Sequence, residues 1–384
     1  MKNIDSQHFE CTQCKAKSFP NMTDLFCNKC HNPLKLSSIS FENYPYQGKH
    51  PQSNYFSQKY RLKTLFGENI VTLNEGNTSI IPLKSISNFV GVEHIDAKLE
   101  FQNPTGSFKD RGASLMISAA KFFGVRSLIE DSSGNAGASI AAYSARANIE
   151  AHIFVPTNAP KAKINQIKNY GAIIHPIEGT RETVANEASS YCKKSNSTYA
   201  SHNLSPFFNE GTKSFGYELL SDYHSRTFPD HIIIPVGNGS LFTGTWNGLV
   251  EAKKHLSSDV KLPKLHCIQS NLTMPIVEAW GGTAIQKNTS TNKSIAGGIS
   301  VNSPPRIKEV LGIINESKGS AISVKESEIL EWYYNLPKLE GVFCEPTSAT
   351  ALAGLDKLVK SGAIKTSEKV LIPITGSGLK DFID

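Results

Sequence analysis

The 384-residue chain has no long apolar run and no strong excess of charge of either sign. No stretch approaches the ~20 consecutive apolar residues that a membrane-spanning helix needs. The opening segment, MKNIDSQHFE, contains no apolar signal-peptide region. These absences exclude the usual sequence signatures of membrane insertion and secretion, so we expect a protein of the cytoplasm.

Its charge is modest and evenly distributed. The formal net charge is +6, and the Lys and Arg residues are spread along the chain instead of being gathered into a stripe, which argues against nucleic-acid binding. Hydrophobic residues make up 39% of the chain and charged residues 19%, as in a globular protein with a substantial core. Internal repeats and low-complexity tracts are absent, and the length suits about two or three domains.

Nucleotide-binding fingerprints are missing as well. The segment PVGNGSLFTG, residues 235–244, lacks the terminal Gly-Lys-Ser/Thr of a P-loop, and its glycines are spaced G-x-G-x4-G instead of G-x-G-x-x-G. No acidic residue is clearly placed for a ribose hydroxyl, so a nicotinamide dehydrogenase is disfavoured. A tight turn is the simpler interpretation of this segment. Its glycines and its place before a predicted helix nevertheless suit the phosphate of a cofactor other than a dinucleotide.

Seven cysteines are present, and four of them lie close together in the pattern C-x2-C-x12-C-x2-C. These are Cys11, Cys14, Cys27 and Cys30. The spacing is typical of a zinc ribbon, with His31 as a less favoured substitute ligand, and four thiolates make a closed structural site. Two disulfides are the alternative, which a cytosolic chain of this size does not need. The isolated Cys192, Cys267 and Cys344 are expected to be small buried side chains.

Beyond about residue 95, short apolar runs alternate with helical stretches. Examples are IDAKLE before a predicted helix over 107–123, and SLIED before a helix containing ASIAAYSARAN. This alternation predicts an α/β fold with two lobes of doubly wound parallel sheets. We expect a zinc ribbon over 8–34, an arm over 35–75 that packs on the main body, and a catalytic region over 76–384.

Polar, glycine-rich loops follow the predicted strands. They are NPTGSFKD, SSGNAG, PVGNGS and PITGSG, and in such sheets the loops at the carboxyl ends of the strands bind ligands, so they could converge on one crevice. SSGNAG offers hydroxyls and a helix N-terminus to a carboxylate, although an ordinary helix cap explains it equally well. PITGSG offers Thr375 and Ser377 as neutral hydroxyl groups.

Lys109 lies in the first turn of the predicted helix after NPTGS. The helix dipole is positive at that end, so an ammonium group is poorly placed there. A solvated surface lysine is one explanation, and a lysine whose neutral amine does chemistry is the other. Together the loops offer a phosphate cradle, a carboxylate cradle, a neutral hydroxyl and an amine. Pyridoxal phosphate joined to an amino acid requires these four features.

Several motifs also match a known family. TLNEGNTSIIPL, NPTGSFKDRG, SSGNAGAS, PVGNGS, EPTSA and TGSGLKD occur in its order, and the second is its lysine motif residue for residue. The chain therefore resembles the threonine synthases and their relatives among the fold-type-II pyridoxal-phosphate enzymes, whose fold is like that of the tryptophan synthase beta chain. Some members also carry an N-terminal zinc ribbon. The resemblance spans nearly the whole chain.

The resemblance implies specific roles. Lys109 would form the Schiff base, Phe108 would lie beside the cofactor, Asn135 would bond its ring hydroxyl, and Thr375 would face its pyridine nitrogen. Gly237, Asn238, Gly239 and Ser240 would hold the phosphate, with Leu241 closing that turn. Ser132, Ser133 and Ala136 would seat the substrate carboxylate. Lys163 and Gln166, in a mobile subdomain over 128–204, are candidates for the leaving phosphate. A homodimer is the expected assembly.

The residue type at the ring nitrogen bears on the reaction. A carboxylate would hold that nitrogen protonated, whereas Thr375 favours a neutral ring, which suits elimination and replacement. The reaction implied is conversion of O-phospho-L-homoserine and water to L-threonine and phosphate. Ser377 and Thr212 stand where the family often has His and Gln, and EPTSA and GGISVNSPPR resemble relatives of other substrates equally well.

Two other interpretations stay open at this point. The first, within the same class, is β-elimination or β-replacement on serine, threonine or phosphoserine, as in the dehydratases or a cysteate synthase-like enzyme. The second is a non-catalytic protein in which the ribbon binds nucleic acid or a partner and the α/β body is a sensor. The ribbon segment is not strongly basic, which disfavours the second interpretation.

Overall fold

The computed structural model describes residues 3–37, 58–223, 227–254, 261–282 and 294–383. Most of the predicted arm, 38–57, therefore lies outside the described residues. The chain divides into two compact units, each built from two stretches of sequence. The first unit, here called the lysine unit, contains Met1–Asn77 and Lys109–Ser221. The second, here called the glycine-loop unit, contains Thr78–Phe108 and Asp222–Asp384.

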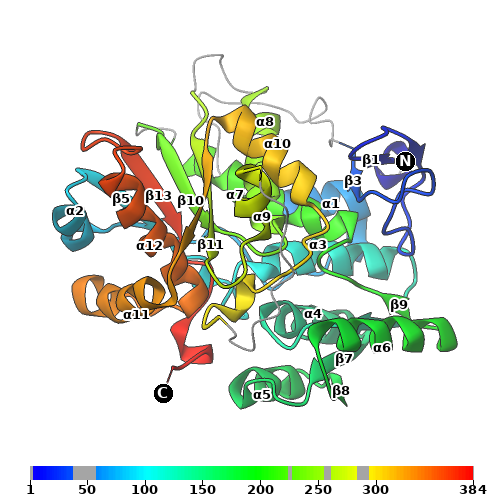
Figure 1. The fold of residues 1–384 in the computed structure, drawn as a ribbon. Coiled ribbons are helices and arrows are strands. Elements are labelled where there is room, and N and C mark those ends of the chain that lie inside the picture. The colour runs from blue at the N-terminus through cyan, green and yellow to red at the C-terminus, as the bar shows by residue number, and fades with distance from the viewer. Residues whose placement is uncertain (1–2, 38–57, 224–226, 255–260, 283–293, 384) are drawn as a thin grey trace. The chain divides into compact units, whose positions relative to one another are not determined.

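The lysine unit begins with a small antiparallel sheet in the order β2-β1-β3. Its strands are β1 (Phe9–Cys11), β2 (Lys17–Ser18) and β3 (Leu34–Leu36), after a 3-10 turn at Asn3–Ser6. Phe9 is fully buried, and its ring centroid lies 5.3 Å from that of Phe207 on helix α7 (Pro206–Asp222). The cysteine-bearing segment therefore shares its hydrophobic core with the rest of this unit (Figure 1).

The larger sheet of this unit is parallel throughout, in the order β8-β7-β6-β9. Its strands are β6 (Ser127–Glu130), β7 (Glu150–Pro156), β8 (Ile173–Ile177) and β9 (Thr198–Tyr199). Successive residues of a strand point to opposite faces, and here each face has its own core. Leu128 packs in the cluster that contains α4, whereas Ile129 packs with Val184 and Ala188 of α6.

The helices of this unit mostly follow its strands, as the sequence predicts for an α/β fold. They are α1 (Gln58–Phe66), α3 (Lys109–Phe122), α4 (Asn135–Ala147), α5 (Lys161–Asn169), α6 (Arg181–Lys194) and α7, with a 3-10 turn at Gly67–Asn69. The predicted helix over 107–123 begins two residues later, at Lys109. It ends at Phe122, two residues before Gly124, whose φ of +74° lies in the left-handed region that favours glycine.

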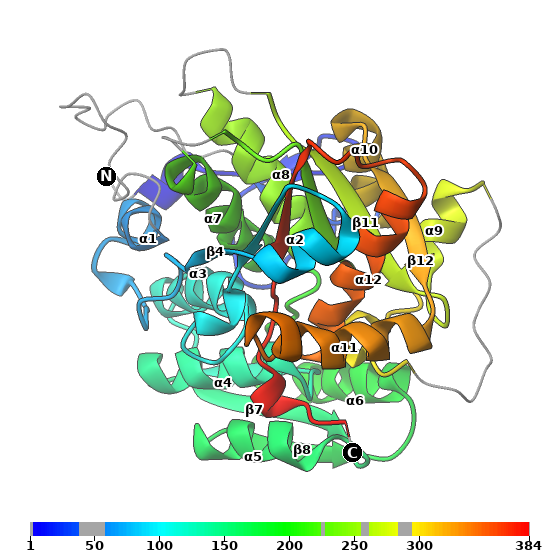
Figure 2. The ribbon, with the colours of Figure 1, turned by 90° about the vertical axis from the view of Figure 1, so that its left-hand side faces the viewer.

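The glycine-loop unit contains a six-stranded sheet in the order β12-β11-β10-β13-β5-β4. The strands are β4 (Ile80–Pro82), β5 (His94–Lys98), β10 (His231–Pro235), β11 (Lys264–Ser270), β12 (Ser320–Val324) and β13 (Lys369–Pro373). Helices α2 (Lys84–Val90), α11 (Glu326–Glu340) and α12 (Pro346–Lys360) pack together on one face (Figures 1 and 2). Helices α8 (Ser240–Lys253), α9 (Pro275–Trp280) and α10 (Ile307–Ser317) pack on the other. Short 3-10 turns lie at Glu100–Gln102, Gly297–Ile299 and Gly378–Lys380.

One strand departs from the predicted parallel arrangement. β4 runs antiparallel to β5, with Ile80 opposite Lys98 and Pro82 opposite Asp96, so the sheet is mixed. Only α2 and a turn at Gly91, with φ +75°, join the two strands, and parallel strands need a longer crossover. β4 lies at the edge of the sheet, where Pro82 costs no ladder hydrogen bond. The prediction of wholly parallel sheets was therefore wrong at this edge.

Within the described part of the chain, no helix is both long enough and apolar enough to cross a membrane.

Candidate active site

Lys109 lies in the first turn of α3, as the sequence predicts, and it is the first residue of this helix. Every residue of this helix from Asp110 to Ala120 is buried, so the helix is a core element and not a surface one. The Lys109 ammonium lies 5.7 Å from the centroid of the Phe208 ring on α7. Gly112 makes this approach possible, because a Cβ at that position would lie 2.5 Å from a carbon of the Phe208 ring. The lysine is therefore presented from a rigid helix packed closely on its neighbour.

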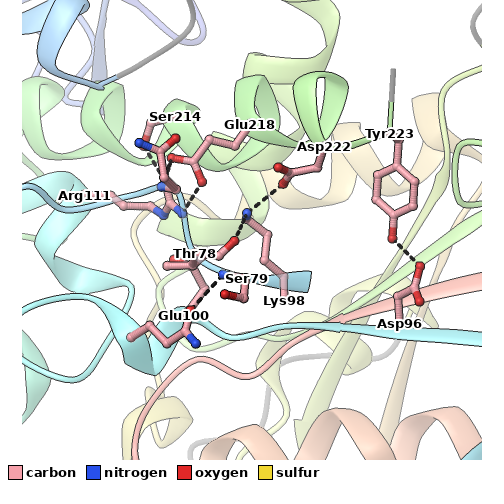
Figure 3. Close-up of polar contacts among 12 residues, drawn as sticks. Thr78, Ser79, Asp96, Lys98, Glu100, Arg111, Ser214, Glu218, Asp222 and Tyr223 are labelled. Carbon is pink, nitrogen blue, oxygen red and sulfur yellow. Dashed lines mark hydrogen bonds and ion pairs between the residues drawn. The ribbon is translucent and has the colours of Figure 1, made fainter. Parts of the chain in front are cut away.

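The two residues after Lys109 fix α3 to the helices beside it. Asp110 is fully buried and accepts a hydrogen bond of 2.5 Å from the Ser139 hydroxyl of α4. Arg111 is also fully buried and makes a bidentate pair with Glu218 of α7, with both N–O distances at 2.7 Å (Figure 3). Ser214 accepts a further hydrogen bond from Arg111 at 3.1 Å. Paired planar groups of this kind set orientation as well as position.

The same carboxylate also holds the entry segment TLNEGNTS. The backbone N–H of Asn77 donates to Glu218 at 2.8 Å. Gly76 has φ +88°, and a Cβ on it would collide with the Glu218 carboxylate. Nearby, Glu75 accepts a 2.8 Å hydrogen bond from the Tyr143 hydroxyl of α4. The motif glycine is therefore required both for its backbone angle and for the close approach of Glu218.

A second buried acid lies at the end of β6, directly before the SSGNAG loop. The Nδ1 atom of His202 lies 2.5 Å from Oε1 of Glu130, and the His202 backbone N–H donates to the other carboxylate oxygen at 3.2 Å. Burial raises the pKa of Glu130 to about 8, although the His202 N–H and the nearby Lys109 oppose the rise. Burial and the positive charge of Lys109 hold the pKa of His202 well below its ordinary value. Both shifts favour the neutral form of the side chain, so Glu130 and His202 add little net charge near Lys109.

The SSGNAG loop is tightly built. Ser132 is buried, and its hydroxyl accepts a hydrogen bond of 3.3 Å from the Gly134 N–H. Helix α4 begins at Asn135, with Gly134 as the residue before it and no side chain capping the helix. The simpler interpretation of Ser or Asn as an ordinary cap is therefore wrong. Ser133 lies half-buried in the loop, and Ala136 is buried in the first turn of α4.

Lys163 and Gln166 both lie on α5, three residues apart and hence on one side of the helix. Both side chains are half-buried, and the Gln166 amide donates to the Tyr170 hydroxyl at 3.4 Å. The charge of Lys163 and the amide of Gln166 are thus presented together.

The PVGNGS loop of the glycine-loop unit follows β10 and leads into α8, which begins at Ser240. None of the described backbone hydrogen bonds uses the N–H of Gly237, Asn238 or Gly239 as donor. Buried backbone donors are normally paired, so this row suits an anion. Gly239 has φ +90°, and its N–H precedes the buried Ser240 and Leu241 at the positive end of the helix dipole.

The space around this loop is closed by a second glycine turn. A Cβ on Gly237 would lie 3.0 Å from Cα of Ile299 and 3.1 Å from the Gly298 carbonyl oxygen. A Cβ on Gly298 would in turn lie 2.7 Å from the Thr347 hydroxyl, which accepts a hydrogen bond from the Gly298 N–H. The donors of the loop and the lack of side chains around it fit the phosphate group that the resemblance implies.

Three of the four predicted loops lie at one edge of one sheet, because they follow the neighbouring strands β10, β13 and β5. The NPTGSF segment runs beside the PITGSG loop: the Phe108 N–H donates to the Thr375 carbonyl at 3.1 Å, and the Ser377 N–H donates to the Gly106 carbonyl at 3.0 Å. The side chain of Lys380 donates to the Thr105 carbonyl at 2.7 Å. The fourth loop, SSGNAG, follows β6 in the sheet of the lysine unit.

Polar contacts hold the end of β5 and the turn that precedes the NPTGSF segment, and Figure 3 shows those of Lys98. Lys98, at the end of β5, is fully buried and donates to the Thr78 carbonyl at 2.9 Å and to Asp222 at 2.8 Å. The Thr78 hydroxyl donates to Glu100 at 2.7 Å, and the Asn103 amide donates to the backbone of Glu100 at the same distance. These hydrogen bonds therefore fix the backbone at which the NPTGSF segment begins.

The four cysteines of the predicted ribbon come together. Their sulfur atoms all lie within 4.8 Å of one another, with 3.4 Å between Cys11 and Cys30 and 3.5 Å between Cys14 and Cys27. The side chain and backbone N–H groups of Asn32 lower the pKa of Cys30 to about 6, and the Lys29 N–H lowers the pKa of Cys27. This donor set could hold a metal ion, and a cluster of four sulfur ligands fits zinc.

Some residues of the site were not predicted from the sequence. Glu130, His202 and Glu218 were not singled out. A signal existed for one contact: Asp110 and Arg111 stand directly beside the lysine in a buried helix, and buried charges need partners. Nothing in the local sequence indicates which distant residues those partners are.

Comparisons with known proteins agree with these features. Residues 71–376 match the family model described as pyridoxal-phosphate dependent enzyme. A curated relative, the threonine synthase of Methanosarcina acetivorans, is 32% identical over 97% of this chain and 92% of that protein. The threonine synthase of Bacillus sp. strain ULM1 is 36% identical over 81% of this chain and 85% of that protein.

A likeness to solved structures shows the fold. The processed form of threonine deaminase isoform 2 from Solanum lycopersicum superposes with a TM-score of 0.67 at 19% identity, covering 86% of this chain and 92% of that one. The fold is therefore that of the fold-type-II enzymes, an α/β arrangement with mixed sheets.

Proposed function

Because the chain belongs to the family of pyridoxal-phosphate dependent enzymes, we propose that it is a lyase that converts O-phospho-L-homoserine and water to L-threonine and phosphate. The observation that carries the proposal is the similarity to the Methanosarcina threonine synthase, which extends over 97% of this chain and 92% of that protein. The position of Lys109 at the start of α3, a buried helix, supports its assignment as the amine that binds the cofactor.

The cofactor-binding residues that the resemblance implies are found in both units. Lys109 would hold pyridoxal phosphate covalently through its side-chain amine, with Phe108 beside the ring and Asn135 bonded to the ring hydroxyl. The N–H groups from Gly237 to Ser240, followed by Leu241, would bind the phosphate, and Thr375 would face the pyridine nitrogen. The bound cofactor supplies an electron sink for the carbon atoms of the substrate.

The protein supplies binding and proton transfer. Ser132, Ser133 and the backbone at Ala136 would hold the substrate carboxylate, while Lys163 and Gln166 would bind the phosphate that leaves from the γ-carbon. The Lys109 amine would take the proton from the α-carbon. In the net reaction the γ-carbon loses its C–O bond to phosphate and gains a proton, while the β-carbon loses a proton and gains the hydroxyl of water. The remaining proton of water leaves on the phosphate, and the α-carbon regains the proton that the Lys109 amine would remove.

A comparison of substrates tests the reaction. We expect the purified protein, supplied with pyridoxal phosphate, to release inorganic phosphate from O-phospho-L-homoserine and to form threonine in equal amount. O-Phosphoserine should release much less phosphate, and threonine should release little ammonia. Rapid ammonia release from threonine without phosphate release from O-phosphohomoserine would instead establish a dehydratase, the alternative reaction.

We also propose that the four-cysteine cluster over 8–34 holds one structural zinc ion, and that the protein is a cytoplasmic homodimer. Metal analysis should find one zinc per chain, and Cys27→Ser should lower this content and the stability of the lysine unit, because the ribbon shares that unit's core. Cys192→Ser is the matched control, since Cys192 lies outside the cluster. Equal zinc contents in the two variants would overturn the zinc assignment.

A further inference from the structure

The NPTGSF segment is paired with the loop that follows β13. The Phe108 N–H donates to the Thr375 carbonyl at 3.1 Å, and the Ser377 N–H donates to the Gly106 carbonyl at 3.0 Å. Both partners of each hydrogen bond belong to the glycine-loop unit. A short antiparallel pairing therefore attaches the residues that directly precede Lys109 to that unit.

The peptide group between Thr105 and Gly106 is hydrogen-bonded at both ends. The Lys380 ammonium donates to the Thr105 carbonyl at 2.7 Å, and the Gly106 N–H donates to the Asn103 carbonyl at 2.7 Å. Thr105 is 2% exposed, and a buried carbonyl needs a donor. A charged donor makes a stronger hydrogen bond than a neutral one. The lysine and the turn at Asn103 thus fix the orientation of this peptide.

Gly106 makes this peptide free to rotate when nothing holds it. Its φ is +82°, and glycine adopts positive and negative φ about equally well. A Cβ on Gly106 would lie 3.2 Å from Cδ and 3.6 Å from Nζ of Lys380, so the lysine side chain packs directly over the glycine. The contact with Lys380, and not a preference of the glycine, therefore selects this backbone conformation.

Lys380 is itself held in place by the segment around it. It is half-buried and ends the 3-10 turn Gly378–Lys380, whose first N–H groups are capped by Ser377. The Ser377 hydroxyl accepts a hydrogen bond from the Leu379 N–H at 3.2 Å. Beyond the turn, the ring centroid of Phe382 lies 5.6 Å from that of Phe343. The ammonium group is therefore presented to the NPTGSF segment from an anchored turn.

We propose that Lys380 is a positioning residue for the reactive amine: it holds the Thr105–Gly106 peptide and so sets the backbone from which Lys109 extends. The inference rests on the proposed function, which gives Lys109 its role. The chain leaves the glycine-loop unit at Phe108 and enters the lysine unit at Lys109, three residues after Gly106. A rotation of the held peptide would displace the start of α3, and a displacement of about 1 Å can cost ~10²-fold in rate.

Hydrogen exchange of the full chain, without substrate, tests the positioning directly. In the wild type we expect the Gly106 amide to exchange slowly. Lys380→Met removes the donor, so this amide should exchange at least ~10-fold faster, the factor that loss of one charge-assisted hydrogen bond gives. Lys357→Met is the matched control, because Lys357 donates to the Ser323 carbonyl at the same 2.7 Å but lies exposed on α12. It should leave the exchange at Gly106 unchanged.

Kinetics adds a readout that distinguishes positioning from substrate binding. Lys380→Met should lower kcat for threonine formation by about 10–100-fold and leave KM for O-phospho-L-homoserine nearly unchanged, because the held peptide affects the amine and not the substrate. Lys380→Arg should recover most of kcat, since a guanidinium can also donate to the Thr105 carbonyl. Lys357→Met should keep the wild-type values.

The outcomes separate the two proposals. Unchanged exchange at Gly106 in a folded Lys380→Met variant would overturn this inference and leave the proposed function intact. A raised KM with unchanged kcat would also overturn it, because the ammonium would then bind the substrate's phosphate. Fast exchange of this amide in the wild type would do the same, even if a variant does not fold. A wild type that forms no threonine would overturn the proposed function and, with it, the role of Lys380 toward the amine.

Discussion

The two compact units fix their candidate site residues by different means. In the lysine unit, buried ionisable side chains surround the start of α3: Asp110, Arg111 with Glu218, and Glu130 with His202. In the glycine-loop unit, the loop after β10 offers backbone N–H groups and glycines instead. An amine that gains and loses a proton needs a tuned electrostatic environment, whereas a phosphate brings its own charge and needs fixed dipoles.

The largest effect should come from Lys109 itself. Lys109→Ala should lower phosphate release by at least ~10²–10⁴-fold, the contribution of a positioned proton-transfer group, and it also removes the covalent attachment of the cofactor. Lys121→Ala, an exposed lysine in the last turn of the same helix, is the matched control and should keep full activity. Steady-state kinetics checks both, with circular dichroism to show that the fold is kept. Full activity of Lys109→Ala would refute the role of the lysine unit.

The ion pair behind the lysine should matter next. Glu218→Gln leaves the buried Arg111 without its charged partner, so we expect the free energy of unfolding to fall by about 3–5 kcal/mol, as for other broken buried pairs. Urea titration measures this loss. Asp356→Asn breaks an exposed pair with Lys360 and should leave the unfolding midpoint nearly unchanged. An equal change in the free energy of unfolding for the two variants would show that the buried pair of Arg111 and Glu218 does not hold α3 in place.

A glycine exchange tests the other unit. Gly239→Ala places a Cβ 2.7 Å from Val310 at a φ of +90°, which should cost ~1–3 kcal/mol of stability and weaken retention of pyridoxal phosphate. Gly312→Ala, in α10, meets no atom within 4 Å and should instead stabilise the helix by ~0.5–1 kcal/mol. Thermal unfolding and equilibrium dialysis of the cofactor distinguish the two. Tight cofactor binding by Gly239→Ala would argue against the cradle.

The smallest effect is a change in the pH dependence of stability. Burial raises the folded pKa of Glu130 from 4.5 to about 8, so its contribution is present at low pH and is lost as the pH rises through that range, by up to ~1.4 kcal/mol per pH unit. The lowered pKa of His202 has the opposite effect on the free energy of unfolding. The unfolded chain binds a proton at this histidine below pH 6.5 and the buried side chain does not, so stability falls as the pH drops below that value. Glu130→Gln should therefore flatten the decline above pH 6.5.

Urea titration across this pH range checks the slope of Glu130→Gln against that of the wild type. Glu182→Gln, at an exposed position in the first turn of α6, is the control and should keep the wild-type slope. An unchanged slope in Glu130→Gln would mean that the buried acid does not supply the pH sensitivity of the lysine unit.

The features that could be predicted from the sequence are local ones. The alternation of strand and helix signals placed Lys109 at the start of α3 and the PVGNGS loop at the start of α8, because each depends on neighbouring residues. The spacing of the four cysteines likewise predicted their cluster, since a short ribbon brings them together. In each case the chain between the participating residues is short or regular.

The contacts that could not be predicted join residues far apart. Arg111 and Glu218 are separated by 107 positions, and Glu130 and His202 by 72, so their pairing depends on how helices and strands pack. The antiparallel direction of β4 depends on its short connection to β5. That connection contains a helix, α2, as the longer crossover connections do, so the helix by itself does not indicate the direction of the strand. The Thr375 hydroxyl likewise donates to Glu345, 30 positions away, and nothing in the local sequence predicts this contact.

The most direct test of the central claim is to locate the cofactor on the chain. The purified protein, incubated with pyridoxal phosphate, is reduced with borohydride, digested and examined by mass spectrometry. We predict that the peptide containing Lys109 carries the added phosphopyridoxyl mass, and that no other lysine does so in comparable amount. Modification of a different lysine, or of none, would contradict the assignment of this chain's reactive amine.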